Sequence, residues 1–95
     1  MFDLIREWAT SRGIFEKGTK QGQFDKFLEE TVELGQEFYA GDVDKMMDEM
    51  GDVVITLTLL AEMHGFTIED AIELAYQKVN KRTGKVVNGQ FVKSS

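Results

Sequence analysis

Two pairs of acidic residues have the spacing that brings side chains together on a helix. Glu30 and Glu33 form one pair, and Glu49 and Asp52 form the other. Residues three apart on an α-helix lie only about 60° apart around its axis, so both carboxylates of a pair point the same way. If the two helices face each other, four carboxylates meet in one place.

A group of four carboxylates favours a divalent metal ion as its partner. Clustered carboxylates repel one another and stay partly protonated unless a cation joins them. Oxygen ligands without histidine or cysteine suit Mg²⁺ or Mn²⁺, and Mg²⁺ readily takes phosphate oxygens as further ligands. Networks of structural ion pairs also bury acids, so the spacing alone leaves both interpretations open.

The second pair has the stronger physical case for facing other helices. Glu49 and Asp52 lie on the stripe that Thr56 and Leu59 continue along a helix that is apolar nearly all round from Val53 onward. Such a helix is normally buried at the centre of its bundle. We therefore expect Glu49 and Asp52 to point inward, whereas Glu30 and Glu33 have a more exposed position on their helix.

Other catalytic arrangements find little support in the residues. The chain has no cysteine, and its one histidine, His64, stands beside Gly65, where a surface or helix-capping role is expected. The glycines are scattered, without the G-x-x-x-x-G-K pattern of a phosphate-binding loop. Phosphate groups would have to be bound by a metal ion and by side chains.

Basic residues gather at the carboxyl end of the sequence, where no acid follows Glu73. Lys78 and Arg82 are four residues apart on an expected helix and could hold an anion between them, although complementing the helix dipole explains them equally well. The net charge of −6 argues against binding duplex nucleic acid. An acidic middle and a basic end suit a cation together with phosphates.

The hydrophobic periodicity predicts an all-α protein of four helices, resembling a four-helix bundle, in a single domain of residues 1–95. An Asn-Gly pair between two β-prone runs adds a short C-terminal β-hairpin, which packs on the bundle or on a second subunit. The expected helices are Phe2–Arg12, Gln23–Tyr39, Asp42–His64 and Thr67 to near Gly84, with a loop over Gly13–Gly22 and the hairpin over Lys85–Val92.

Size and hydropathy set expectations for assembly and location. A chain of 95 residues buries a modest core, so we expect at least a dimer. Its longest apolar run, Val53–Ala61, is far shorter than the roughly 20 residues that span a bilayer. The amino-terminal residues mix charged and apolar types, unlike a secretory signal. We expect a cytoplasmic protein that does not bind membranes.

The acidic pairs occur in a context that resembles a known family. Residues 28–34, LEETVEL, and residues 49–53, EMGDV, are similar to the E-E-x-x-E … E-x-x-D signature of MazG-like proteins. Residues 78–93, KVNKRTGKVVNGQFVK, resemble the tail of short, stand-alone MazG-like proteins, some of them encoded by phages. The resemblance extends from Phe24 to Lys93.

This resemblance implies an all-α pyrophosphohydrolase that cleaves nucleoside or deoxynucleoside triphosphates to the monophosphate and pyrophosphate, as a homodimer or homotetramer. It implies Mg²⁺ as the cofactor, with Mn²⁺ as a possible substitute. The metal ligands implied are Glu30, Glu33, Glu49 and Asp52. Glu29 would orient or deprotonate water, and the phosphates would be held by Lys78, Arg82 and Lys85.

Two other functions remain open at this point. The phosphoribosyl-ATP pyrophosphohydrolase of histidine synthesis resembles this family in fold and acids, although its usual tail differs. A non-catalytic helical module would use the acids to bind a cation or the hairpin to recruit a partner. Trp8 and Phe15 are candidates for stacking on a base, but aromatic residues at helical spacing more often belong to the core.

Overall fold

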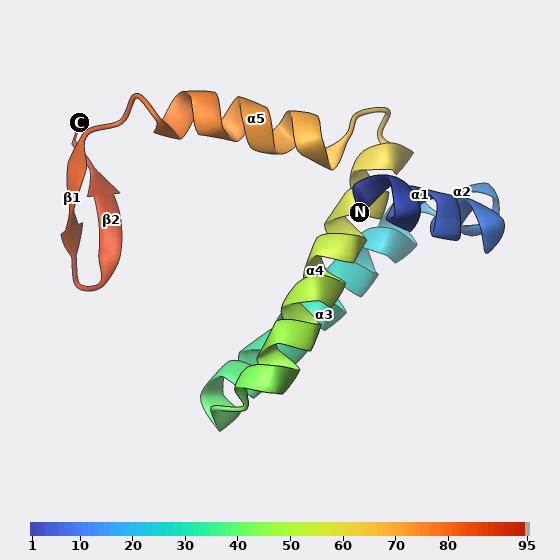
Figure 1. Ribbon diagram of the computed structural model, residues 1–95, viewed down its shortest axis with the longest axis horizontal. Coiled ribbons are helices and arrows are strands. Elements are labelled where there is room, and N and C mark those ends of the chain that lie inside the picture. Colours follow the sequence, from blue (N-terminus) through green and yellow to red (C-terminus); the bar gives the residue numbers. More distant parts are fainter. Residues whose placement is uncertain (95) are drawn as a thin grey trace.

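The computed structural model describes residues 1–94, which form helices and one two-stranded antiparallel sheet (Figure 1). In chain order the elements are α1 Phe2–Ser11, α2 Ile14–Lys17, α3 Lys20–Ala40, α4 Val43–Met63, α5 Ile68–Val79, β1 Gly84–Val87 and β2 Gln90–Lys93. The prediction of an all-α fold with a short C-terminal hairpin is confirmed. The helices and the hairpin divide into a body, residues 1–64, and an arm, residues 68–93.

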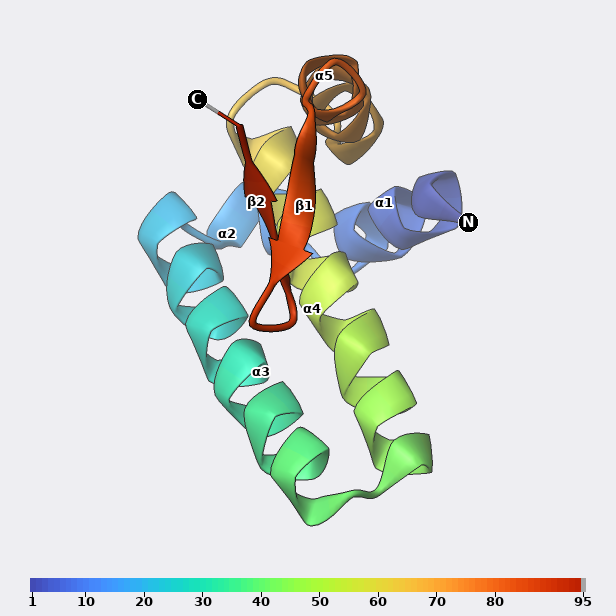
Figure 2. The same ribbon diagram turned by 90° about the vertical axis from the view of Figure 1, so that its left-hand side faces the viewer.

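The body is built around α3 and α4, which run side by side (Figures 1 and 2). Each begins at a capping side chain: Thr19 accepts a hydrogen bond from the backbone N–H of Gly22, and Asp42 accepts one from that of Lys45. Gly41 ends α3 in the left-handed conformation, with φ of 73°. The connection is so short that α4 must return antiparallel along α3.

The core is small and lies where α1 crosses the second half of α4. Its fully buried apolar residues are Ala9, Leu59 and Ala61. Thr58 is also fully buried, and its hydroxyl donates to the backbone oxygen of Val54 at 2.7 Å, which satisfies that polar group within its own helix. Small side chains at this crossing let the helix backbones approach closely. The carboxyl half of α4 is therefore fixed more firmly than its amino half.

The arm leaves the body at a sharp corner, since α5 is bent by 101° from α4 (Figure 1). Gly65 makes this turn possible with φ of 85°. At the far end, Asn88 and Gly89 both have positive φ and close the predicted hairpin, in which Val87 pairs with Gln90. Within residues 1–94 no single helix is long and apolar enough to cross a membrane, and α4 with α5 reaches that length and composition only as a bent pair.

The arm exposes an apolar stripe that the rest of the chain does not cover. Ile72, Tyr76 and Val79 follow one another at helical spacing and are 55%, 61% and 45% exposed. The radius of gyration is 15.9 Å, against about 12 Å for a compact chain of this length. The accessible surface is 7330 Å², against about 5,500 Å² expected for a folded monomer of this mass. Such an excess is typical of a subunit that buries surface in an oligomer.

One predicted boundary is wrong. The Gly13–Gly22 segment was expected to be a loop, but it contains α2 and the first turn of α3. The side chain of Thr19 starts α3 at Lys20, three residues before the expected start, because an N-cap hydrogen bond to Gly22 outweighs the low helix propensity of one glycine in the first turn. The bounds of α1 and α4 lie within one residue of those predicted.

A second boundary is wrong as well, since α5 ends at Val79 with Asn80 as its C-cap and not near Gly84. Arg82 therefore lies beyond the helix that was expected to carry both it and Lys78.

We predict that the chain self-associates through this stripe and that Ile72→Asp makes it monomeric, because a charge placed in the exposed apolar stripe cannot be buried unpaired in an interface. The matched control is Gln77→Asp, which puts the same charge on the polar face of α5. Sedimentation velocity at micromolar concentration checks both variants. A wild-type protein that is monomeric, or an Ile72→Asp variant that stays associated, would contradict the assignment of this stripe to an interface.

Candidate metal centre

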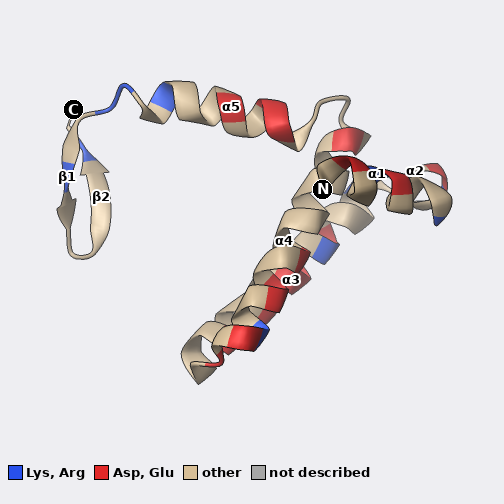
Figure 3. Cartoon of the chain, in the orientation of Figure 1, with Lys and Arg blue, Asp and Glu red and all other residues tan. Residues whose placement is uncertain are grey.

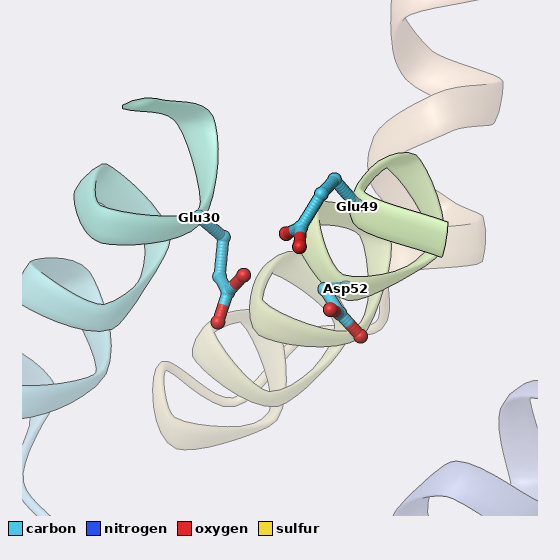
Figure 4. A group of neighbouring side chains, drawn as sticks. All are labelled: Glu30, Glu49 and Asp52. Atoms are coloured by element: carbon cyan, nitrogen blue, oxygen red, sulfur yellow. The ribbon is translucent and has the colours of Figure 1, made fainter. Parts of the chain in front are cut away.

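Three carboxylates meet between α3 and α4 (Figure 4). Glu30 projects from α3 toward α4, and Glu49 and Asp52 project from successive turns of α4. One carboxylate oxygen from each of the three residues lies within 4.8 Å of the others. The i, i+3 spacing places the two acids of α4 on one face, and the antiparallel pairing of the helices brings Glu30 opposite to them.

The cluster is partly buried and short of hydrogen bonds. Glu30 is only 7% exposed, whereas Glu49 and Asp52 are half-buried, so the expectation that Glu30 is the more exposed acid is wrong because α4 covers that face of α3. Within residues 1–94, the Oε2 atoms of Glu30 and Glu49 are buried and have no hydrogen-bond partner. One cation approaches, since Lys26 Nζ lies 3.4 Å from Glu30 Oε1, but it also lies 3.2 Å from Glu29 Oε2. A single shared ammonium group leaves buried negative charge and lone pairs uncompensated.

The pKa values of these acids are shifted by burial and by the interactions of the carboxylates with one another. Burial, followed by interactions with Glu30 and Glu33, raises the pKa of Glu49 to about 7. Burial also raises the pKa of Asp52, and hydrogen bonding with Glu30 raises that of Glu33. Burial acts in the same direction on Glu30, but hydrogen bonding with Glu33, Glu49 and Lys26 outweighs it and lowers the pKa. The pKa values of Glu33 and Glu49 are thus raised while that of Glu30 is lowered, as expected when neighbouring carboxylates titrate together.

Hard oxygen donors that are buried, close together and incompletely neutralised fit a divalent cation such as Mg²⁺ or Mn²⁺. A cation at this position would satisfy the two buried oxygens of Glu30 and Glu49 and lower the raised pKa of Glu49. The donor set contains no histidine or sulfur ligand, which disfavours zinc and copper.

The other predicted site residues lie at different distances from this cluster. Glu33 stands one turn beyond Glu30 on α3 and is electrostatically coupled to it, although its oxygens are not among the three that converge. Glu29 is 56% exposed at its side chain and pairs with Lys26. Lys78, Arg82 and Lys85 are exposed on the arm, and Figure 3 shows the basic residues of that end well away from the acidic faces of α3 and α4.

A pocket of about 420 Å³ opens beside the cluster, and Glu30 and Asp52 form part of its wall. Trp8, Ile55 and Leu59 provide apolar surface there. The complete lining is Trp8, Ile14, Gln23, Lys26, Glu30, Asp52, Ile55, Thr56 and Leu59. This volume is in the range of small-molecule sites, and its combination of an aromatic wall with an acidic edge suits a nucleoside attached to a metal-bound polyphosphate.

Two polar residues of this pocket, Gln23 and Lys26, were not predicted from the sequence. Lys26 could have been found, because it precedes Glu30 by four residues and Glu29 by three, the spacings of helical ion pairs. Gln23 donates from its side-chain amide to the backbone oxygen of Thr56 at 3.2 Å, a contact between helices that no local pattern reveals. His64 caps α4 and its Nδ1 lies 2.9 Å from the backbone oxygen of Leu60, which confirms its expected capping role.

Comparison with known proteins agrees with this geometry. The MazG nucleotide pyrophosphohydrolase domain family matches residues 19–87, a span that contains all three clustered acids. The chain belongs to the MazG family. The match begins at Thr19, which caps α3, and ends at the last residue of β1. It therefore includes the whole of α3, α4 and α5.

Two relatives of this MazG domain come from a phage and a bacterium. An uncharacterized 18.2 kDa protein from the rep-hol intergenic region of Haemophilus phage HP1 is 33% identical over 60 residues, which are 63% of this chain and 37% of the phage protein. A nucleoside triphosphate pyrophosphohydrolase of Mycolicibacterium smegmatis is 30% identical over 71 residues, 68% of this chain and 22% of that protein. The chain thus corresponds to about a third or less of each relative's length, and no solved structure matches it.

The raised pKa of Glu49 predicts how stability depends on pH in the absence of metal. Folding lifts this pKa from 4.5 to about 7, so the stabilising effect of protonation is complete below about pH 4.5 and is lost as the pH rises through about 7. We therefore expect the melting temperature in the presence of a chelator to fall between about pH 5 and pH 8.5. The fall should be smaller in Glu49→Gln, which stays neutral throughout.

Differential scanning calorimetry across this pH range checks the prediction. Asp44→Asn is the control, because it removes an exposed acid from the same helix and should keep the wild-type pH dependence. Equal pH dependence in Glu49→Gln and wild-type protein would show that Glu49 titrates normally and that the cluster is not strained in the absence of metal.

Proposed function

We propose that this MazG domain hydrolyses nucleoside or deoxynucleoside triphosphates to the monophosphate and pyrophosphate in a Mg²⁺-dependent reaction. The observation that carries the proposal is the trio of Glu30, Glu49 and Asp52 at the edge of the 420 Å³ pocket, with two buried oxygens that lack hydrogen-bond partners. The printed name of the mycobacterial relative, a nucleoside triphosphate pyrophosphohydrolase, supports the same activity.

Glu30, Glu49 and Asp52 would hold the metal ion, with Glu33 as a further ligand at the edge of the cluster. When bound, Mg²⁺ supplies neutralisation of the triphosphate charge and a lowered pKa for a coordinated water. The carboxylates of α4 project from the turns just before the buried part of that helix, which begins at Thr56. Mn²⁺ has similar ligand preferences and would substitute.

In the reaction, a water oxygen forms a bond to the α-phosphorus while the bond from that phosphorus to the bridging oxygen breaks, so pyrophosphate leaves. The water loses a proton to a carboxylate, and we assign this role to Glu29. Glu29 directly precedes Glu30 in α3 and its side chain is accessible, and its partner Lys26 would exchange it for a phosphate oxygen. An exposed carboxylate can pass the proton on to solvent.

The pocket beside the cluster would hold the nucleoside. Trp8 forms part of its wall and is 47% exposed, which leaves a ring face available to stack on a base. The amide of Gln23 and the ammonium group of Lys26 are its polar groups near the acids. Because stacking is tolerant of base identity, this pocket does not by itself select one base.

The phosphate-binding cations would come from the arm of a second copy of the chain. Lys78, Arg82 and Lys85 lie on the arm, which turns away from the cluster of its own chain at 101° (Figure 3). The same arm carries the exposed apolar stripe, and the surface in excess of a compact monomer is roughly 1,800 Å², enough for a stable homodimer. The part of the arm that follows Glu73 is basic and contains no acid, so it also complements an acidic body electrostatically. The site is then complete in a homodimer, or in a homotetramer built from two.

The activity is tested by incubating the purified protein with a panel of triphosphates, deoxynucleotides and phosphoribosyl-ATP in Mg²⁺ and measuring pyrophosphate. We expect hydrolysis of at least one substrate, loss with a chelator, and a decrease in kcat of at least about 100-fold in Glu49→Gln. Asp44→Asn should retain wild-type activity, because that exposed acid lies outside the cluster. Absence of pyrophosphate with every substrate, or an active Glu49→Gln variant, would refute the proposal.

Mixed oligomers test whether the cations act between subunits. A Glu49→Gln chain and a chain with Lys78→Gln, Arg82→Gln and Lys85→Gln should each be inactive alone. When refolded together in equal amounts, they should recover about a quarter of wild-type activity, since half of the dimers are mixed and each mixed dimer has one intact site of two. No recovery on mixing, with oligomer formation verified by light scattering, would place the cations and the cluster of one chain in the same site.

A further inference from the structure

The junction between the body and the arm has very little packing. In α5 only Ile68 and Ala71 are partly buried, and the remaining residues of the helix are exposed. The hairpin is exposed along both strands. With so few apolar contacts, the core does not determine the direction in which the arm projects. Polar contacts at the corner must contribute to it.

Arg6 of α1 makes those polar contacts on both sides of the corner. Its Nη1 and Nη2 atoms donate to the two carboxylate oxygens of Glu69 at 2.9 and 2.6 Å, a bidentate contact with the first turn of α5. Its Nε lies 3.5 Å from Glu62 Oε1 in the last turn of α4, and Nη2 lies 2.7 Å from Asp3 Oδ1. Among the ion pairs of residues 1–94, Arg6–Glu69 is the one that joins α5 to another element.

The geometry of this network is more restrictive than that of an ordinary surface pair. The Arg6 side chain is 17% exposed, and its planar guanidinium group fixes the relative orientation of its partners. The hydrogen bond from Arg6 holds the pKa of Glu69 at about 2, so the pair stays charged throughout the physiological range. Without the guanidinium group, Asp3, Glu62 and Glu69 would face one another as uncompensated charges and repel.

We propose that Arg6 is a positioning residue, whose contacts with Glu62 and Glu69 fix the angle at which the arm leaves the body. The corner then holds α5 in one direction, and the apolar stripe and basic end of the arm are presented to the second copy in a defined position. The effect on catalysis rests on the proposed function, whereas the effect on arm orientation does not.

The orientation is measured by electron–electron double resonance between two spin labels. The chain has no cysteine, so Lys45→Cys on α4 and Gln90→Cys on the hairpin give one label each on body and arm. Doubly labelled chains are refolded with an excess of unlabelled chains so that nearly every oligomer that carries labels contains only one labelled chain. In this background Arg6→Met should broaden the distance distribution at least about twofold, because the arm then samples several orientations.

Arg12→Met is the matched control, since Arg12 also lies at α1 and takes part in no ion pair of the described residues; its distribution should equal that of the wild type. Glu69→Gln removes the partner instead of the arginine and should broaden the distribution even if Arg6→Met does not fold. Wild-type distributions in both Arg6→Met and Glu69→Gln would overturn the proposal.

Kinetics separate positioning from general destabilisation. Arg6→Met should raise KM for the triphosphate about tenfold while kcat changes less and Mn²⁺ affinity, followed by electron paramagnetic resonance, stays constant. Arg6→Lys keeps the charge without the bidentate contact and should fall between Arg6→Met and the wild type. Broadening with unchanged KM would overturn the link to substrate binding. Broadening in a protein whose wild type hydrolyses no triphosphate would refute the proposed function and leave the positioning role standing.

Discussion

The structure depends on the close antiparallel packing of α3 against α4, which forces three carboxylates together with one shared lysine to neutralise them. This arrangement is unfavourable for the chain alone, since Glu30 and Glu49 each keep a buried oxygen without a hydrogen bond and the pKa of Glu49 rises to about 7. Protein cores normally avoid such groups. The packing next to the cluster nevertheless contains buried residues of α4, namely Thr58, Leu59 and Ala61. A site that a divalent cation would complete is thus maintained at some cost in stability.

The small size of the apolar core also explains why the arm projects from the body. The chain has only 95 residues, and part of its central helix pair is occupied by acids. Little apolar surface remains in the body against which α5 could pack. The arm therefore projects with its apolar stripe exposed (Figures 1 and 2). In the account proposed here, a second copy covers that stripe and the arm brings its basic residues to the acidic body. Folding, assembly and substrate binding would then depend on one another, with Arg6 setting the geometry of the connection.

The sequence predicted the fold and the acidic residues better than it predicted the side-chain contacts between helices. Helical periodicity and the Asn-Gly pair were enough to place the hairpin and every helix except the short α2, because these features depend on local spacing. The i, i+3 rule placed Glu49 and Asp52 together for the same reason. Local patterns did not reveal the start of α3 at Lys20, where a single threonine cap decided the boundary, nor the contact of Gln23 with Thr56. The 101° corner and its Arg6 network depend on residues 63 positions apart and lay beyond any local rule.

The central claim is that Glu30, Glu49 and Asp52 form a divalent metal site. Crystals grown with Mn²⁺ and measured on both sides of the manganese absorption edge test it most directly. The account predicts an anomalous peak between α3 and α4, with oxygens of these three residues as ligands at about 2.2 Å, and no such peak in Glu49→Gln. A cluster that binds no Mn²⁺ at millimolar concentration, or a peak coordinated by other residues, would contradict it.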